Sequence, residues 1–198
     1  MDVFNKDVIL LSSSPRRKQI LENMGFSVKV RLNHTDETYP SELSPEKTVT
    51  FLAKKKNDSY KDAVQKNEVL IAADTIVTFN DKILGKPVDY GQAFDMLHSL
   101  SGQKHKVLTG CCIRDNKKEV CFFETTYVWF NSLKEEEISY YINTEQPFDK
   151  AGAYGIQEWI GMIGINRIEG DFYNVMGLPA HRIWRELSQN FTEKYILN

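Results

Sequence analysis

The chain has 198 residues, 41% of them hydrophobic, and a formal net charge of −2 at pH 7. This length and hydrophobic content are sufficient for one α/β domain with a substantial core, so disorder is excluded. The small net charge gives no overall field for holding DNA or RNA, and no run approaches the roughly 20 apolar residues of a membrane span. The first residues also lack the pattern of a signal peptide. We therefore expect a cytoplasmic protein that binds a small ligand, with no nucleic-acid or membrane partner.

The first predicted elements are a strand over residues 8–11, a serine-rich turn and a helix. Pro15 suits the first helical position, with Ser14 as the N-cap. Arg16 and Arg17 then fall in the first turn, where the positive end of the helix dipole disfavours each cation by about 0.3–1 kcal/mol. Free N–H groups, hydroxyls and guanidinium groups at one helix start are typical of a polyanion site, such as a site for a nucleotide phosphate chain. The alternative is a solvated basic turn.

The remaining elements follow from the periodicity of the apolar residues. In the first half of the chain we expect a strand over 26–32, a polar loop, a helix begun by Ser44 and Pro45, and a long strand over 69–79 that turns through Asn80 and Asp81 into a hairpin over 83–87. In the second half we expect a helix around 93–100, a strand pair over 106–113 and 120–130, and a helix capped by Ser132 and Glu135. A strand near 162–168 and a last helix from Pro179 complete the prediction. Because strands and helices alternate early and hairpins follow later, this order predicts an α/β fold with a mixed twisted sheet and flanking helices.

The cysteines and His105 give little sign of chemistry. Cys111, Cys112 and Cys121 are odd in number and lie in strand-like apolar segments, so we expect reduced core residues. A zinc site has little support, because the chain has no Cys-x-x-Cys and no paired histidine spacing. We expect His105 at the surface or at a sheet edge rather than as a base.

Asp74 breaks the pattern of a strand, LIAADTIV, that otherwise has every mark of burial. An ionised carboxylate in a core costs several kcal/mol unless it is paired, hydrogen-bonded or bound to a metal. In one interpretation Asp74 pairs with a buried arginine or caps a backbone group. In the interpretation that we favour, its face of the strand opens onto a cleft, where Ala73 and Thr75 leave room for a hydrated cation. Magnesium is the natural candidate, because it binds one or two carboxylates together with substrate phosphates.

Further polar residues suit the same cleft. Glu37 is the best second carboxylate, although the pattern alone does not distinguish it from Asp36. Lys56 closes a run of three lysines, the first two of which are better interpreted as an exposed helix face. Lys86 lies between a glycine and a proline, a constrained backbone that can aim its ammonium group. Two carboxylates for a metal, an arginine pair and one or two lysines suit phosphoanhydride hydrolysis, in which a carboxylate takes the proton of an attacking water.

Eight segments in series carry a resemblance to a known family. They are LLSSSPRR near the start, DE at 36–37, LAKKK ending at residue 56, AADTIV, ILGKP, LSGQKHKVLTG, DKAGAYGIQ at 149–157 and EGDFYNVMGLP at 169–179. Each segment is weak evidence alone, but the series spans nearly the whole chain. In this order they resemble the Maf family of nucleoside triphosphate pyrophosphatases, also called septum formation inhibitor proteins.

The resemblance implies one Maf-like domain over residues 1–198, with a fold related to the inosine-triphosphate pyrophosphatases, two lobes with the active site in the cleft between them, and commonly a homodimer. It also implies hydrolysis of a nucleoside triphosphate to the monophosphate and diphosphate with a divalent metal, magnesium or manganese. The matching positions imply Asp74 as the proton acceptor. Matched in the same way, the phosphate-binding turn comprises Ser14, Arg16 and Arg17, and the remaining polar cleft residues are Glu37, Lys56 and Lys86.

Three positions that sort the family's substrates read Arg16, Thr75 and Gln157. This combination is similar to the members that hydrolyse dTTP and UTP, whereas the 7-methyl-GTP members resemble a turn with Trp before the arginine pair and a Glu at the later position. A neutral Gln can donate to pyrimidine O4 and accept from N3–H. Many relatives place Gly after this Gln, but this chain has Glu158 and Trp159, which we expect in solvent and packed under the sheet, respectively.

The resemblance thus predicts a pyrophosphatase for dTTP and UTP, with modified pyrimidine triphosphates as further substrates. Two alternatives stay open at this point. One is a broader house-cleaning pyrophosphatase for non-canonical nucleotides, and the other is a nucleotide-binding regulator of cell division.

Overall fold

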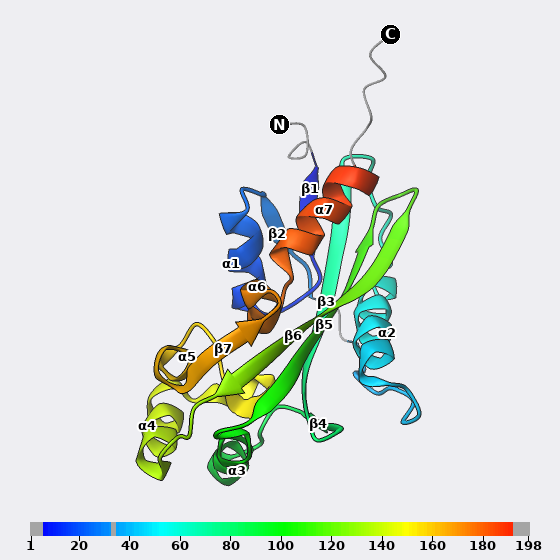
Figure 1. The fold of residues 1–198 in the computed structure, drawn as a ribbon. Helices are drawn as coiled ribbons and strands as arrows, with labels where there is room; N and C mark the ends of the chain where they lie inside the picture. The colour runs from blue at the N-terminus through cyan, green and yellow to red at the C-terminus, as the bar shows by residue number, and fades with distance from the viewer. Residues whose placement is uncertain (1–5, 33–34, 192–198) are drawn as a thin grey trace.

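The computed structural model describes residues 6–32 and 35–191, which form a mixed sheet with helices on both faces (Figure 1). The strands are β1 (Asp7–Leu10), β2 (Val28–Val30), β3 (Glu68–Phe79), β4 (Lys82–Leu84), β5 (Lys104–Arg114), β6 (Glu119–Phe130) and β7 (Ile165–Glu169). The helices are α1 (Pro15–Asn23), α2 (Pro45–Asp58), α3 (Tyr90–Leu100), α4 (Glu135–Glu145), α5 (Trp159–Gly164), α6 (Phe172–Met176) and α7 (Ala180–Asn190), with short 3-10 turns η2 (Pro147–Asp149) and η3 (Ala151–Ala153). The predicted α/β fold class is confirmed.

The seven strands have the order β2-β1-β3-β5-β6-β7, with β4 paired to β3. β1 is parallel to both β2 and β3, whereas β3, β5, β6 and β7 are antiparallel neighbours. α2 covers one face of the long strands, and α1, α6 and α7 cover the other (Figure 1). β3 is therefore buried on both faces, which explains why its sequence is an almost continuous apolar run.

Two hydrophobic clusters lie on the α1, α6 and α7 face of β3. The first cluster packs α1 and α7 against β1, β3 and β5, and includes Ala73. The second packs α3, α4 and η3 against the other end of the sheet and includes Val77. Because alternate residues of a strand share a face, Thr75 lies between the two clusters. The apolar packing is thus interrupted by a polar residue in the middle of the central strand.

A buried polar seam continues from Thr75 across the sheet. Thr75 Oγ1 and Thr109 Oγ1 lie 3.0 Å apart, and Thr109 Oγ1 donates to the backbone carbonyl of Asn174 at 3.0 Å. Asn174 Nδ2 in turn donates to Thr126 Oγ1 at 3.0 Å and to the Val107 carbonyl at 3.1 Å. These bonds fix α6 over β5 and β6, so that the loop after α6 is held close to Thr75.

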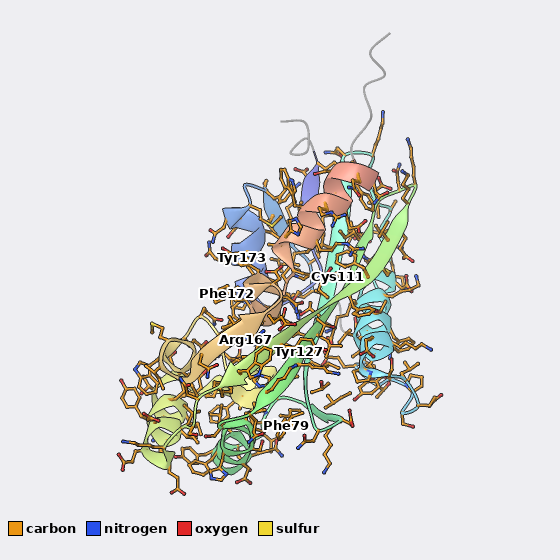
Figure 2. All side chains as sticks on the ribbon, in the orientation of Figure 1. Phe79, Cys111, Tyr127, Arg167, Phe172 and Tyr173 are labelled. Carbon is orange, nitrogen blue, oxygen red and sulfur yellow. A yellow bond between two sulfur atoms is a disulfide. The ribbon has the colours of Figure 1, made fainter. Side chains whose placement is uncertain are left out.

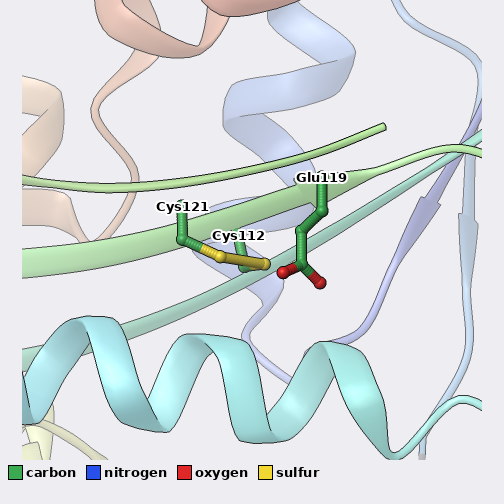
Figure 3. A group of neighbouring side chains, drawn as sticks. All are labelled: Cys112, Glu119 and Cys121. Atoms are coloured by element: carbon green, nitrogen blue, oxygen red, sulfur yellow. A yellow bond between two sulfur atoms is a disulfide. The ribbon is translucent and has the colours of Figure 1, made fainter. Parts of the chain in front are cut away.

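The cysteine prediction is wrong for two of the three residues. Cys112 and Cys121 are register partners on β5 and β6 and form a disulfide, with Glu119 beside it (Figure 3). Both sulfur atoms take part in this bond. The carboxylate of Glu119 pairs instead with Lys54 of α2, whose Nζ lies 2.6 Å from Glu119 Oε1. Cys111 (labelled in Figure 2) belongs to the first hydrophobic cluster, on the other face of the sheet, where it is buried and free as predicted, and burial raises the pKa of its thiol to about 12.

Three further local predictions are wrong. His105 is 2% exposed rather than at the surface, because its ring packs on Phe130 and its Nε2 bonds Tyr154 Oη at 2.7 Å. The expected strand near 162–168 begins only at residue 165, since residues 159–164 form α5. α4 begins at Glu135 with Lys134 as its N-cap, and Glu137 accepts from the Lys134 backbone N–H, so the predicted capping box lies two residues too early.

Among residues 6–32 and 35–191, no helix has both the length and the hydropathy needed to cross a membrane.

Candidate active site

A cavity of about 890 Å³ opens beside the middle of β3. β1 pairs with β3 only as far as Ile71, and β4 pairs with it only from Val77 onwards. Within the described chain, the stretch between these two residues has a neighbouring strand only on the β5 side. The chain leaving β1 and the chain leaving β4 both diverge there, so their polar turns line the space that a continuous strand would fill. The sheet topology therefore determines where the cavity lies.

The cavity brings together eight of the nine predicted site residues. Its walls include Ser14, Arg16, Arg17, Glu37, Lys56, Thr75, Lys86 and Gln157. Asp74 is the exception, because its side chain lies behind Lys56, which does line the wall. Residues from six separate parts of the sequence thus meet at one place.

Arg17 fixes the turn after β1 to the rest of the molecule. Its Nε donates to the Gly177 carbonyl at 2.8 Å, Nη1 to Ser12 Oγ at 3.0 Å and Nη2 to Thr75 Oγ1 at 3.0 Å. The Ser14 hydroxyl accepts from the Arg17 backbone N–H at 3.5 Å, as expected of an N-cap. Burial lowers the pKa of the Arg17 guanidinium and the Asp74 carboxylate opposes this shift. Arg17 therefore presents a desolvated cation whose orientation is set by three elements.

Arg16 has a different environment from Arg17. Its Nη1 lies 2.9 Å from Asp149 Oδ2, and its side chain is 24% exposed. Asp149 also pairs with Lys150 at 2.7 Å. Arg16 is thus a partly solvated cation on the cavity wall, balanced by one acid, and the arginine pair is not two equivalent charges.

Two carboxylates meet at the Lys56 ammonium on the α2 side of β3. Asp74, 9% exposed, forms an ion pair with Lys56, and Glu37 Oε1 lies 2.8 Å from Lys56 Nζ. Asp36 instead accepts hydrogen bonds from Thr38, so the structure places Glu37 and not Asp36 at the cavity. The hydrogen bond from Lys56 lowers the pKa of Glu37, and the charges of Lys86 and Arg17 add to this effect.

α2 can bring Lys56 to Asp74 because the strand beneath it lacks a side chain at one point. The register partner of Asp74 is Gly110 on β5. A Cβ atom at Gly110 would lie 2.2 Å from the Val49 carbonyl oxygen of α2. The glycine thus permits a close approach of helix and sheet at the level of the acid.

Lys86 lies on the cavity wall just after β4. The preceding Gly85 accepts a backbone hydrogen bond from Gly152 at 3.0 Å, which fixes this turn to η3. The Lys86 side chain is exposed, and its charge acts on Glu37. The constrained backbone predicted around Lys86 is therefore present, with an anchor that the sequence pattern did not indicate.

Gln157 lies on the cavity wall next to a carboxylate that the sequence interpretation put in solvent. Glu158 is only 15% exposed; it accepts from Gln157 Nε2 at 3.1 Å and from the Tyr141 hydroxyl, and it pairs with Lys150 at 3.2 Å. The expectation of a solvated Glu158 is wrong. Trp159 packs edge-to-face on Tyr140 of α4, with ring centroids 4.8 Å apart.

The sequence interpretation gave no role at this site to three charged residues of this region. Asp149 and Lys150 line the cavity, and Glu158 lies directly behind Gln157. Their one local signal is that all three are charged residues within a segment rich in glycine and aromatic residues.

The protein is thus of the α/β class, with a mixed sheet and a cation-lined cavity where its central strand has, among the described residues, a neighbouring strand on one side only. Within that class, residues 7–190 match the Maf-like protein family, and the chain belongs to this family.

Curated relatives agree with this assignment. The chain is similar to a dTTP/UTP pyrophosphatase of Bacteroides fragilis, with 45% identity over 183 residues, which is 92% of this chain and 95% of the relative. It is also 45% identical to a dTTP/UTP pyrophosphatase of Cytophaga hutchinsonii over 194 residues, covering 98% of this chain and 88% of the relative. A dTTP/UTP pyrophosphatase of Porphyromonas gingivalis is 45% identical over 183 residues, covering 91% and 92% of the two chains.

Proposed function

We propose that this protein is a nucleoside triphosphate pyrophosphatase that hydrolyses dTTP and UTP, and modified pyrimidine triphosphates as further substrates, to the monophosphate and diphosphate. The observation that carries the proposal is a single cavity whose wall holds five cationic side chains and, behind one of them, a carboxylate in a buried strand. The relatives from Bacteroides fragilis and Cytophaga hutchinsonii, both dTTP/UTP pyrophosphatases, support the same substrates.

The chain's own residues supply binding, orientation and proton transfer. Arg16, Arg17 and Lys86 bind the phosphate chain, since each presents a cation to the cavity. Asp74 takes the proton of a water whose oxygen bonds to the α-phosphorus, the anhydride bond from that phosphorus breaks, and diphosphate leaves. Lys56 orients the Asp74 carboxylate by pairing with it.

A divalent metal fits the donor set at this place. Asp74 and Glu37 both pair with Lys56 Nζ, so carboxylate oxygens from β3 and from the loop before α2 lie close together around this ammonium. Magnesium and manganese suit such oxygen donors, with substrate phosphates and water completing the shell. We propose Asp74 and Glu37 as the ligands; when bound, the ion would screen the phosphate charge.

Gln157 and Thr75 are the proposed specificity residues, together with Arg16. Gln157 is exposed on the cavity wall, and its amide offers both a donor and an acceptor to a pyrimidine edge. Thr75 lies between the two hydrophobic clusters and accepts a hydrogen bond from Arg17, so it links β3 to the turn that carries Arg16 and Arg17.

A panel of triphosphates tests the proposal. The purified protein is incubated with dTTP, UTP, CTP, ITP and GTP in magnesium, in manganese and in excess chelator, and the products are separated by ion exchange. We expect monophosphate and diphosphate from dTTP and UTP with metal and none with chelator. A preference for ITP would instead favour the broader house-cleaning function, and binding without hydrolysis would favour a regulatory role.

Two further proposals concern assembly and location. We propose a homodimer, because large apolar side chains are exposed on α5 and α6: Met162 on α5, and Phe172 and Tyr173 on α6 (the latter two labelled in Figure 2). Sedimentation equilibrium measures this state directly, and a mass of 22.9 kDa would contradict it. We also propose a cytoplasmic location, which cell fractionation tests.

A further inference from the structure

We propose that Glu158 is a positioning residue that fixes the amide of Gln157, so that the site accepts a uracil or thymine ring and rejects cytosine. The inference rests on the proposed function, because it requires that Gln157 meets the base. Gln157 lines the cavity, whereas Glu158 lies behind it.

The carboxylate of Glu158 decides which way the Gln157 amide points. Gln157 Nε2 lies 3.1 Å from Glu158 Oε1. An ionised carboxylate has acceptors only, so the group facing it must be the amide NH2 and not the carbonyl oxygen. One N–H of Gln157 is then used internally, and the carbonyl oxygen together with the second N–H is left for a ligand.

Glu158 is itself held by two other donors. The Tyr141 hydroxyl donates to its Oε2, and Lys150 Nζ lies 3.2 Å from its Oε1. Tyr141 is completely buried on α4, and its hydroxyl accepts from the Gly155 backbone N–H at 3.0 Å. Burial, the hydrogen bond to Glu158 and the negative charge of Glu158 all raise the pKa of Tyr141. The hydroxyl therefore keeps its proton and stays a donor.

The backbone also makes room for this arrangement. A Cβ atom at Gly155 would lie 2.5 Å from the carboxylate carbon of Glu158. The side chain of Lys150, like that of Glu158, is largely buried, at 9% exposed. Rotation of Glu158 away from Gln157 would thus break one ion pair and one hydrogen bond in a desolvated place, so the amide has one favoured orientation.

That orientation matches only one kind of pyrimidine. Uracil and thymine present an acceptor at O4 next to a donor at N3–H, which complements a free N–H next to a carbonyl oxygen. Cytosine presents a donor at N4 next to an acceptor at N3, the reverse pattern. A site built to hydrogen-bond one pattern discriminates strongly against its reverse, because the buried polar groups are then left unpaired.

The experiment compares UTP with CTP in four proteins: the parent, Glu158→Met, Glu158→Gln and Glu136→Met. Glu158→Met removes the acceptors at similar side-chain length, whereas Glu158→Gln keeps one acceptor oxygen for Gln157. Glu136→Met is the matched control, because Glu136 is an exposed acid on α4. The readouts are kcat and KM for hydrolysis with magnesium, and the Kd of each nucleotide in excess chelator.

We expect Glu158→Met to lower the UTP-to-CTP ratio of kcat/KM about tenfold, the effect of one lost orienting hydrogen bond. The change should come through a higher KM for UTP at nearly constant kcat, since the amide binds the base and not the reacting phosphorus. Glu158→Gln should recover most of the ratio, and Glu136→Met should leave it unchanged. The ratio of Kd values should move in parallel.

A folded Glu158→Met protein with the parent's ratio would overturn the inference. The same fall in Glu158→Gln would also overturn it, because the negative charge rather than the acceptor oxygen would then set the preference. If Glu158→Met does not fold, Tyr141→Phe replaces it, and an unchanged ratio there would be equally decisive. Hydrolysis of neither nucleotide by the parent would contradict the proposed function alone, since the Kd ratio still measures the role of Glu158.

Discussion

Asp74 is an acid that follows completely buried residues of β3, and the ion pair with Lys56 offsets the free-energy cost of burying its carboxylate. If it takes the proton of the attacking water, Asp74→Asn should lower kcat for dTTP by about 10²–10⁴-fold, the usual contribution of a general base. The fold should persist, because Lys56 keeps its contact with Glu37 at 2.8 Å. Diphosphate release and circular dichroism check the two expectations.

Asp36→Asn is the matched control for Asp74→Asn, because Asp36 is exposed and bonds Thr38 and Lys55 rather than Lys56. It should retain the parent's kcat. If the two variants were equally active, the assignment of Asp74 as the proton acceptor would be wrong.

His105 gives a prediction on pH and stability. Burial lowers its pKa from 6.5 to about 4. The unfolded chain therefore binds a proton between these two values that the folded protein does not. The contribution of neutral His105 to the free energy of unfolding is fully present above pH 6.5 and is lost as the pH falls toward 4. In this range the free energy of unfolding changes by up to about 1.4 kcal/mol per pH unit.

The measurement is urea unfolding of the parent and of His105→Gln between pH 4.5 and 7.5. Gln cannot be protonated in this range, so the parent should lose stability on acidification faster than the variant does. Parallel curves for the two proteins would show that His105 titrates normally and is not desolvated as the structure indicates.

The candidate site was predictable from sequence where residues break a local pattern. Asp74 interrupts a buried strand, and Arg16 and Arg17 occupy a helix start that disfavours cations, so each carries a signal in its own segment. Glu158 carries no such signal. Its environment is set by Tyr141, 17 residues away, and by the fold of a glycine-rich segment without regular periodicity.

At the scale of elements, the approach of α2 to β5 sets the position of Lys56. The Gly110→Ala substitution places a methyl group 2.2 Å from the Val49 carbonyl oxygen, so α2 must move outward. We expect a loss of about 1–3 kcal/mol in the free energy of unfolding, typical of overpacking. Activity should fall further than stability alone explains, because Lys56 moves with the helix. Urea unfolding and kcat/KM for dTTP measure the two effects.

Gly91→Ala in α3 is the control for Gly110→Ala. A Cβ atom there has no contact closer than 3.5 Å, and alanine is the better helix former. This variant should be as stable as the parent or more stable, with unchanged activity. An equal loss in both variants would mean that the Gly110 contact has no special role.

The predicted elements agree with the structure where periodicity is long and unbroken, as in β3 and α7. They fail at boundaries that tertiary contacts decide. A strand was expected near 162–168, yet residues 159–164 are helical because Ile160 packs into the second hydrophobic cluster. The sequence of these six residues alone does not predict a tertiary contact of this kind.

At the scale of the whole molecule, the cavity lies where the two hydrophobic clusters leave a polar interval around Thr75. No local pattern in the sequence predicts which strands pair, so the gap between the end of β1 and the start of β4 was not predictable from single segments. The pairing is set by contacts far apart in the chain, such as Leu10 with Ile71 and Val77 with Leu84. Asp74 and the family resemblance predicted a cleft, and the sheet topology gives the physical reason for its position.

Because the cavity is lined from both sides of this interval, a bound nucleotide should stabilise the whole fold. Arg17 belongs to the helix of the first cluster, whereas Gln157 follows residues of the second. An α,β-imido analogue of dUTP resists hydrolysis and can be added at 100 times its Kd, where ligand linkage contributes about 2.7 kcal/mol. We expect one cooperative unfolding transition at higher Tm in calorimetry.

Lys86→Met tests whether this stabilisation depends on the phosphate contacts. Lys86 is exposed, and within residues 6–32 and 35–191 it makes no ion pair, so its removal should leave the Tm of the free protein unchanged. At the same analogue concentration the upward shift in Tm should shrink markedly, because one of the cations facing the phosphates is lost. An undiminished shift in Lys86→Met would place the phosphate chain elsewhere in the cavity, away from the turn that follows β4.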